Sequence, residues 1–382
     1  MLAMAACKQH CSDVAIIGGG PAGSSLAVLL TERGITATVI EAGNYCGPSM
    51  GQSLSPSANP LLTQLDVDLA AGGGNRRSRG VSVSWGGRSL RSNEHFWTPY
   101  GNGWHVERPR FDRLLARKAI RAGALIFCNA RVSSCSALPR QKWSLEFQTV
   151  GGLQRLQCRF LVDATGRIGC QTLPRAVRST VYDRLIGITW VGKSAATCPY
   201  TLVETVEHGW VYASVMPDSR STVVLMTDSD IYKSNRHKRT GFWDGELRQV
   251  RHILEMFPET LQSYPQRILS ASTILRMPCS GVNWLKIGEA AVSFDPISGQ
   301  GVYQALAGAV RAASVVEHYF RTGNTIRSYD AWVQRSFERY QSVLNGYYSQ
   351  ERRWARSPFW RRRHLDAVGS RSRVASSPDI VG

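Results

Sequence analysis

Two glycine-rich segments and a run of alternating apolar residues predict an α/β protein. The expected architecture is a Rossmann-like nucleotide-binding domain, an antiparallel-sheet domain and a C-terminal helical segment. The first glycine segment, 18–23, stands between a strand pattern and a helix pattern, and the second, 288–301, lies about 270 residues further on. Between them, residues 185–227 alternate with the period of two that is typical of half-buried strands.

The segment 18–23 has the pattern of a phosphate-binding turn, with a short strand predicted at 13–17 and a helix at 24–33. In such a turn Gly18 permits the tight bend, Gly20 lets the backbone approach a pyrophosphate, and Gly23 lets helix and strand pack closely. Ala22 completes the set of candidate contacts in this turn. The anion is expected at the unpaired N–H groups of the helix N-terminus.

A second strand is predicted at 36–40, and it ends in Glu41. An acidic side chain at this distance from the glycine turn is where an adenosine ribose would find its hydrogen-bond acceptor. Strand, turn, helix and acid together predict a dinucleotide site.

The late segment indicates which dinucleotide binds. A strand is predicted at 284–287, a turn at 295–296, and a long helix at 299–320. The first N–H groups of this helix can face the pyrimidine edge of a flavin, where reduction leaves negative charge. An NAD enzyme has no need of this second motif, so the sequence predicts FAD. The candidate contacts are Gly288, Glu289, Asp295, Pro296, Gly299, Gln300 and Gly301.

The pair of motifs resembles the FAD-dependent monooxygenase and halogenase superfamily, which has the para-hydroxybenzoate hydroxylase fold. Residues 104–115 are similar to the helix start whose arginine reaches the FAD phosphates or ribityl chain, and that arginine is Arg108 here. Residues 160–167 resemble the strand end that closes over the adenine side, which implies roles for Asp163 and Gly166. The family usually has Gly-Asp where this chain has Gly288-Glu289, so the contact of that acid is expected to shift.

The resemblance implies a Rossmann-like FAD-binding domain made of residues 12–45, 98–175 and 275–320. Residues 46–97 and 176–274 are assigned to the substrate domain. A C-terminal helical region is predicted at 321–369 and a disordered tail at 370–382. The helical region carries an apolar stripe with spacings near three and four: Tyr329, Trp332, Phe337, Tyr340, Leu344 and Tyr347.

The composition of the chain bears on its cellular compartment and on the class of partner that it could bind. The chain has 382 residues, nine cysteines and a formal net charge of +18. No apolar run is long enough for a membrane span and no secretion signal is visible, so a cytoplasmic enzyme with reduced thiols and no metal site is expected. The charge is compatible with an acidic partner protein or peptide, and basic faces that are only solvated are the alternative. Nucleic-acid binding is not predicted, because no recognition motif accompanies the charge.

The chain lacks motifs that are typical of two classes of flavin enzyme, the self-sufficient hydroxylases and the halogenases. Self-sufficient hydroxylases of this superfamily usually carry an Asp-Gly pair for NADPH, and the nearest equivalent here, at 163–166, lacks that pair. Reduction by a separate flavin reductase, or by NAD(P)H without a marked binding motif, is therefore an alternative of at least equal weight. Halogenases need a lysine some 35–40 residues after the ribose acid, and this chain has no lysine between Lys8 and Lys118. Hydroxylation by a flavin hydroperoxide is therefore favoured over halogenation.

Within the superfamily, the chain is most similar to flavoproteins that mature tryptophylquinone cofactors in partner oxidases and amine dehydrogenases. The similar segments are 84–87, 100–105, 209–212, 226–228 and 295–301. The resemblance implies hydroxylation of a tryptophan side chain in another polypeptide. A small aromatic substrate and a flavin-binding protein without catalysis remain as alternatives.

The candidates for the substrate pocket are Trp85, Trp210 and Tyr212, which could stack against an aromatic ring. Packing in the sheet core is the alternative for each of them. His105 and His208 are candidate general bases, with a structural role as the alternative. No catalytic side chain is assigned.

Overall fold

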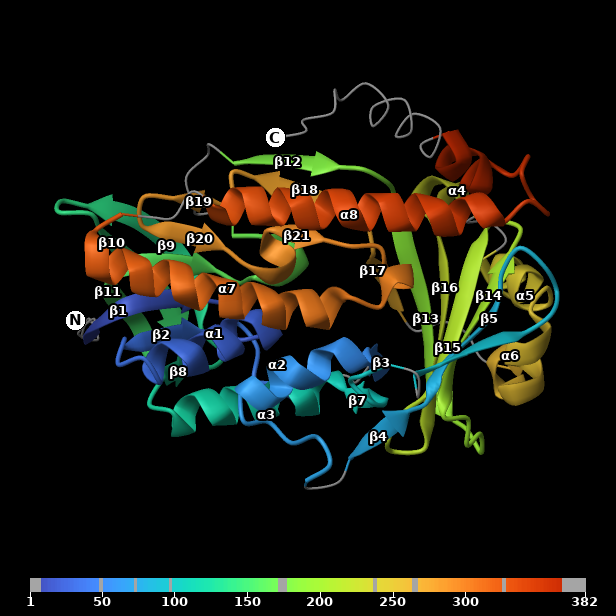
Figure 1. Ribbon diagram of the computed structural model, residues 1–382, viewed down its shortest axis with the longest axis horizontal. Coiled ribbons are helices and arrows are strands. Elements are labelled where there is room, and N and C mark those ends of the chain that lie inside the picture. The colour runs from blue at the N-terminus through green and yellow to red at the C-terminus, as the bar shows by residue number, and fades with distance from the viewer. Residues whose placement is uncertain are drawn as a thin grey trace, which may run out of the picture.

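The computed structural model describes residues 8–47, 51–71, 74–95, 98–170, 177–235, 239–262, 267–324 and 328–365. Two large sheets stand at opposite ends of the long axis, and two long helices run between them (Figure 1). This mixed α/β architecture confirms the predicted fold class. Within the described residues, no helix is long and apolar enough to cross a membrane.

The first large sheet contains the parallel strands of the nucleotide-binding fold. Its parallel strands, in order along the sheet, are β20 (Trp284–Lys286), β11 (Gly152–Asp163), β1 (Lys8–Ile17), β2 (Ala37–Ile40) and β8 (Leu125–Phe127). Antiparallel strands extend it: β9 (Arg131–Leu138), β10 (Lys142–Thr149) and β19 (Ser280–Gly281). The helices packed with it are α1 (Pro21–Thr31), α3 (Arg108–Arg121) and α7 (Gly301–Thr322).

Burial on both faces explains why β1 has an unbroken apolar end. Val14 and Ile16 belong to the main hydrophobic cluster, and Ala15 and Ile17 to a second cluster on the other face. Successive side chains of a strand point to opposite faces, so a parallel strand covered on both sides must be apolar throughout. Pro21 begins α1, where its fixed φ and missing N–H are tolerated.

The second large sheet has seven strands. The alternation predicted over 185–227 is wrong: the strands there are buried almost throughout, so both faces of this sheet are covered. Its strands, in order, are β17 (Arg267–Ser270), β13 (Leu185–Lys193), β16 (Arg220–Asp228), β15 (Gly209–Val215), β14 (Tyr200–Val206), β5 (Gly80–Ser84) and β6 (Arg91–Glu94). One pairing departs from the antiparallel pattern, because β5 is parallel to β14. β5 precedes β14 by more than a hundred residues, and a connection of that length does not impose the direction of a hairpin.

Two small sheets join the large ones. β7 (Gly103–Glu107) pairs with β3 (Gly51–Leu54) and β4 (Asn75–Ser78), and β18 (Ile274–Met277) pairs with β12 (Arg178–Val181) and β21 (Val292–Ser293). Strands from region 46–97 thus pair in two sheets. The shorter helices are α2 (Asn59–Gln64), α4 (Ser229–Ser234), α5 (Arg239–Leu247) and α6 (Arg251–Met256).

The helix α8 (Ser328–Gln350) connects the two halves of the molecule. It runs beside α7 and reaches across to the seven-stranded sheet, where a short helix at 358–365 follows (Figure 1). One buried apolar cluster includes residues of α1, α7, α8 and both large sheets, so the halves share a core. The predicted tail at 370–382 lies outside the described residues.

The stripe predicted on α8 needs one correction. Tyr347 is 50% exposed, whereas Tyr348 is 2% exposed and faces the core. Tyr340, Leu344 and Tyr348 are spaced four apart, and residues at this spacing lie on one face of a helix.

Candidate functional site

The glycine turn 18–23 leaves room for a phosphate group at one position. A Cβ on Gly18 would lie 2.4 Å from the Ala164 carbonyl oxygen, and one on Gly23 would lie 1.9 Å from that of Gly18. A Cβ on Gly20 would meet nothing within 4 Å, and no side chain caps α1. Open space before uncapped helix N–H groups fits a pyrophosphate.

Glu41 lies at the mouth of this turn. Its Oε2 accepts from Gly19 N and its Oε1 accepts from Gly43 N, both at 2.6 Å. Tyr45, which the sequence did not single out, donates to the Gly19 carbonyl at 3.0 Å and covers the turn. Each carboxylate oxygen can accept a further bond, so Glu41 is placed to receive ribose hydroxyls.

Arg108 is held by its own chain. Its Nε and Nη2 donate to the two carboxylate oxygens of Asp112 at 3.1 and 3.0 Å, and its Nη1 donates to Gln52 at 2.9 Å. The three bonds use three of the five N–H donors of the guanidinium, and the second N–H on each Nη is left for the predicted contact with FAD. Asp112 is the partner that the sequence analysis missed, although the i, i+4 spacing would have indicated it.

An ion pair joins the two later motifs. Glu289 Oε1 lies 2.6 Å from Arg167 Nη2, and Arg276 donates to the backbone carbonyls of both residues. The glutamate at the place of the usual aspartate thus reaches the end of the 160–167 segment. Its predicted contact with FAD stays a prediction.

Asp163 is buried and bonds to neighbouring residues of the protein. Its Oδ2 lies 2.6 Å from Lys286 Nζ, and both side chains are buried. Its Oδ1 accepts from the amide and hydroxyl of Thr165 at 3.0 and 2.6 Å. A buried pair with this many hydrogen bonds fixes the turn that carries Gly166 (φ +71°).

The turn at 295–299 places the start of α7 toward open space. Asp295 Oδ1 accepts from Ile297 N at 2.9 Å, and Pro296 and Ser298 bound a 3-10 turn. Gly299 has φ +59°, and a Cβ on Gly299 or on Gly301 would meet nothing within 4 Å. Gly299 N donates to the Pro296 carbonyl at 2.9 Å and Gln300 N to Ser298 Oγ at 3.3 Å, and no side chain caps α7. The uncapped first turn of α7, which begins at Gly301, fits the predicted contact with the flavin ring.

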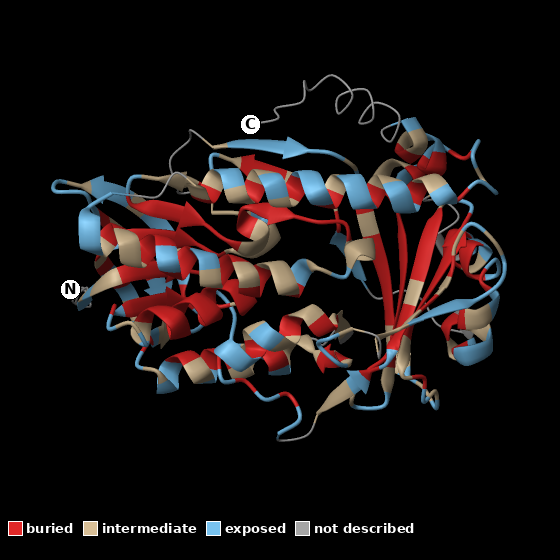
Figure 2. Ribbon diagram, in the orientation of Figure 1, coloured by how far each residue is buried: buried red, intermediate tan, exposed pale blue. Residues whose placement is uncertain are grey.

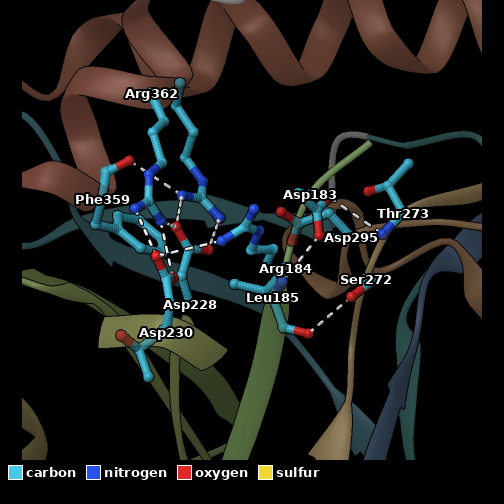
Figure 3. Close-up of polar contacts among 12 residues, drawn as sticks. Asp183, Arg184, Leu185, Asp228, Asp230, Ser272, Thr273, Asp295, Phe359 and Arg362 are labelled. Atoms are coloured by element: carbon cyan, nitrogen blue, oxygen red, sulfur yellow. Dashed lines mark hydrogen bonds and ion pairs between the residues drawn. The ribbon is translucent and has the colours of Figure 1, made fainter. Parts of the chain in front are cut away.

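Asp295 is buried, and α8 completes its surroundings. Its Oδ2 accepts from the Tyr348 hydroxyl at 2.6 Å, and its N–H donates to Tyr340 Oη at 2.7 Å. Burial, with the nearby Asp183 carboxylate, raises the pKa of Asp295 to about 6. Figure 3 shows Asp183 beside Asp295, held by the amides of Thr273 and Leu185 at 3.1 and 2.9 Å.

The structure brings the three predicted pocket aromatics together. Ring centroids of Trp85 and Trp210 lie 6.5 Å apart, and those of Trp210 and Tyr212 lie 6.0 Å apart. Trp210 is 1% exposed, and its Nε1 donates to Tyr348 Oη at 3.1 Å. Trp85 and Tyr212 are partly exposed and are better placed to meet a substrate ring.

The C-terminal helix 358–365 covers this aromatic group. The Trp360 ring lies 5.5 Å from that of Trp85. Arg363 and Arg362 each pair with Asp228 at 2.9 Å, and Arg362 also pairs with Asp230 at 2.6 Å (Figure 3). The sequence analysis predicted a helical region here but missed the contacts with Trp85 and Asp228, because these partners are more than a hundred residues away along the chain.

The two candidate histidines both have partners in the protein. Burial lowers the pKa of His105 to about 4, and its Nδ1 lies 3.1 Å from Ser53 Oγ. His208 Nδ1 lies 2.7 Å from Glu246 Oε1, and this hydrogen bond raises the pKa of His208. His105 is therefore neutral at physiological pH, while His208 is biased toward the charged form.

Comparison with known proteins identifies the family. Residues 11–321 match the protein family described as FAD binding domain. The chain belongs to this family. Its cofactor is FAD, and it is an FAD-dependent oxidoreductase, as predicted from the two glycine motifs.

Three similar proteins have names that state different activities. The chain is 24% identical to the putative FAD-dependent oxidoreductase LodB of Marinomonas mediterranea, over 92% of this chain and 96% of LodB. The flavin-dependent halogenase CmlS superposes with a TM-score of 0.80 at 23% identity, over 96% of this chain and 70% of CmlS. The peptidyl tryptophan dihydroxylase QhpG superposes with a TM-score of 0.76 at 23% identity, over 97% and 80%. At these identities the two structures establish the fold alone.

Proposed function

We propose that this protein is an FAD-dependent monooxygenase that hydroxylates an electron-rich aromatic ring. The leading substrate is a tryptophan side chain in a partner polypeptide. The observation that carries the proposal is the group formed by Trp210 and Tyr212 of β15 with Trp85, which follows β5. The Tyr348 hydroxyl connects this group to the turn before α7. Such a group can hold an aromatic ring near the flavin site and exclude water.

The reaction consumes one molecule of oxygen, two electrons and two protons for each ring. One oxygen atom replaces a ring hydrogen as a hydroxyl group, and the other leaves as water. FAD, when bound, supplies the two electrons and activates oxygen. The protein binds and orients the cofactor through the 18–23 turn and the start of α7, and it positions the substrate ring. A separate flavin reductase is proposed as the electron source, because the Asp-Gly pair is missing.

Halogenation is the second candidate, and the similarity to CmlS favours it. The window 35–40 residues after Glu41 contains arginines in place of the required amine. Arg76 donates to the Thr197 carbonyl at 2.7 Å, and the Arg77 guanidinium lies 5.5 Å from the Trp104 ring centroid. A guanidinium stays protonated and has no free amine to offer, which favours hydroxylation.

Mass spectrometry of tryptophan peptides tests the proposal. The FAD-loaded enzyme is supplied with NADH, a flavin reductase and oxygen, and each peptide is matched by one with phenylalanine in place of tryptophan. The proposal predicts added oxygen on tryptophan only. Oxygen on free indole but on no peptide would contradict the polypeptide substrate, and no oxygenated product at all would contradict the monooxygenase.

A further inference from the structure

The outward face of α8 combines exposed arginines with exposed apolar side chains. Arg335, Arg339, Val343 and Tyr347 are spaced four residues apart and are all exposed. Residues at this spacing form one ridge along a helix. Val343 is 52% exposed and Tyr347 is 50% exposed. Figure 2 shows the exposed positions repeating along α8.

The ridge continues onto the loop between β5 and β6. Trp85 Nε1 donates to the Tyr347 carbonyl at 2.9 Å, and Gly86 N donates to Glu351 at 3.0 Å. These bonds hold the loop against the end of α8. Further exposed arginines flank the junction, and with the ridge they define the α8 surface: Arg88, Arg335, Arg339, Val343, Tyr347, Arg352 and Arg356.

Other arginines near the α8 surface form ion pairs with carboxylates. Arg353 pairs with Glu351 at 2.7 Å, and Arg362 and Arg363 pair with Asp228. Within the described part of the chain, no carboxylate pairs with an arginine of the α8 surface. Glu338, which precedes Arg339, accepts a hydrogen bond from Gln334 Nε2 at 2.8 Å. Five guanidinium groups thus face solvent beside apolar side chains, and this pattern complements an acidic, partly apolar segment.

The opposite face of α8 packs against the turn at 295–299, which precedes α7. Tyr340 and Tyr348 both bond to Asp295. A helix with its side chains is about 10 Å thick. A segment bound to the α8 surface would therefore lie about one helix diameter from Asp295, and next to Trp85.

We propose that the α8 surface docks an acidic segment of the partner polypeptide that carries the tryptophan. The inference rests on the proposed function and names where its substrate is recognised. Carboxylates of the segment pair with the arginines, and its apolar side chains pack on Val343 and Tyr347. Val343 and Tyr347 form an apolar part of the α8 surface between arginines. This favours a polypeptide partner over a nucleic acid, because a nucleic-acid backbone supplies charge but no apolar side chains.

Charge reversal on two faces tests the proposal. The full-length, FAD-loaded protein is prepared as wild type, as the double variant Arg335→Glu/Arg339→Glu, and as the control Arg117→Glu/Arg121→Glu on the exposed face of α3. Both double variants change the net charge equally. The probe is a fluorescein-labelled peptide rich in glutamate with one tryptophan, and its Kd is measured by anisotropy. We expect the α8 variant to raise Kd about tenfold or more and the control to raise it about twofold or less.

Two further arms complete the test. Tyr347→Ala, which leaves the charge unchanged, should also raise Kd, whereas a labelled oligothymidine of equal charge should bind more weakly than the peptide. Equal effects of the two double variants, or tighter binding of the oligothymidine, would overturn the proposal. The FAD absorbance and the melting temperature show that each variant is folded. Binding is read without turnover, so docking on α8 with no oxygen transfer would contradict the proposed function and leave this inference standing.

Discussion

The Tyr348 hydroxyl donates a hydrogen bond of 2.6 Å to Asp295 Oδ2 and accepts one of 3.1 Å from Trp210 Nε1. A single side chain of α8 therefore joins the turn that starts α7 to the aromatic group on the seven-stranded sheet. Both neighbours are buried, at 1% exposure each. The helix α8 is thus part of the candidate site.

Removing this hydroxyl should destabilise the protein. Tyr348→Phe leaves Asp295 without one donor and Trp210 without its acceptor, and a buried unsatisfied polar group costs about 1–3 kcal/mol. Urea denaturation should show a loss of that size in the free energy of unfolding. Tyr347→Phe is the matched control, because the side chain of Tyr347 is 50% exposed, and it should change stability little. Equal stability of the two variants would remove Tyr348 from this role.

Gly20→Val should abolish FAD uptake. The Cβ at this position points into the space proposed for the pyrophosphate, where no protein atom lies within 4 Å. Gly245→Val on α5 is the control, because a Cβ there also meets no neighbour within 4 Å. The amount of bound FAD is measured from the flavin absorbance of each purified protein. A Gly20→Val protein that retains FAD would refute the location of the phosphate.

Arg108→Ala should weaken FAD binding by about 1–3 kcal/mol, the scale of a lost charge-assisted hydrogen bond. The change also frees Asp112 from its partner, so the folded fraction is checked by circular dichroism. Arg117→Ala, an exposed change on the same helix, should leave the Kd of FAD unaltered. If fluorescence titration gives Arg108→Ala the Kd of the wild type, this arginine does not contact the cofactor.

The raised pKa of Asp295 makes stability depend on pH. Its pKa is about 6 in the folded protein and 3.8 in an unfolded chain, so the folded state holds the proton more tightly. The associated stability is fully present below pH 3.8 and declines as pH rises to 6, by on the order of 2–3 kcal/mol. Asp295→Asn should lack this decline, and the exposed change Asp68→Asn should keep it. Parallel urea-denaturation profiles of the wild type and Asp295→Asn across pH 4–7, at one saturating FAD concentration, would disprove the assignment.

The sequence predicts the parts of the site that depend on local backbone rules. Gly18, Gly20 and Gly299 are recognisable because a tight turn or an open helix start needs a residue without a side chain. Glu41 follows from its place at a strand end. These signals span few residues, so a single sequence reveals them.

The parts that were missed depend on contacts distant along the chain. Tyr348 meets Asp295, and Trp360 donates to the Val206 carbonyl at 2.9 Å. The parallel pairing of β5 with β14 is equally non-local. Helical spacing alone led to Tyr347 as the apolar position, which is wrong, because tertiary packing buries Tyr348 and exposes Tyr347.

The most direct test of the central claim is one reaction that offers both chemistries. The FAD-loaded protein, a flavin reductase and NADH act on tryptophan peptides under ¹⁸O₂ with excess bromide. We predict peptides heavier by one ¹⁸O atom on the indole ring, with no brominated product. Brominated tryptophan at turnover rates would contradict the monooxygenase account.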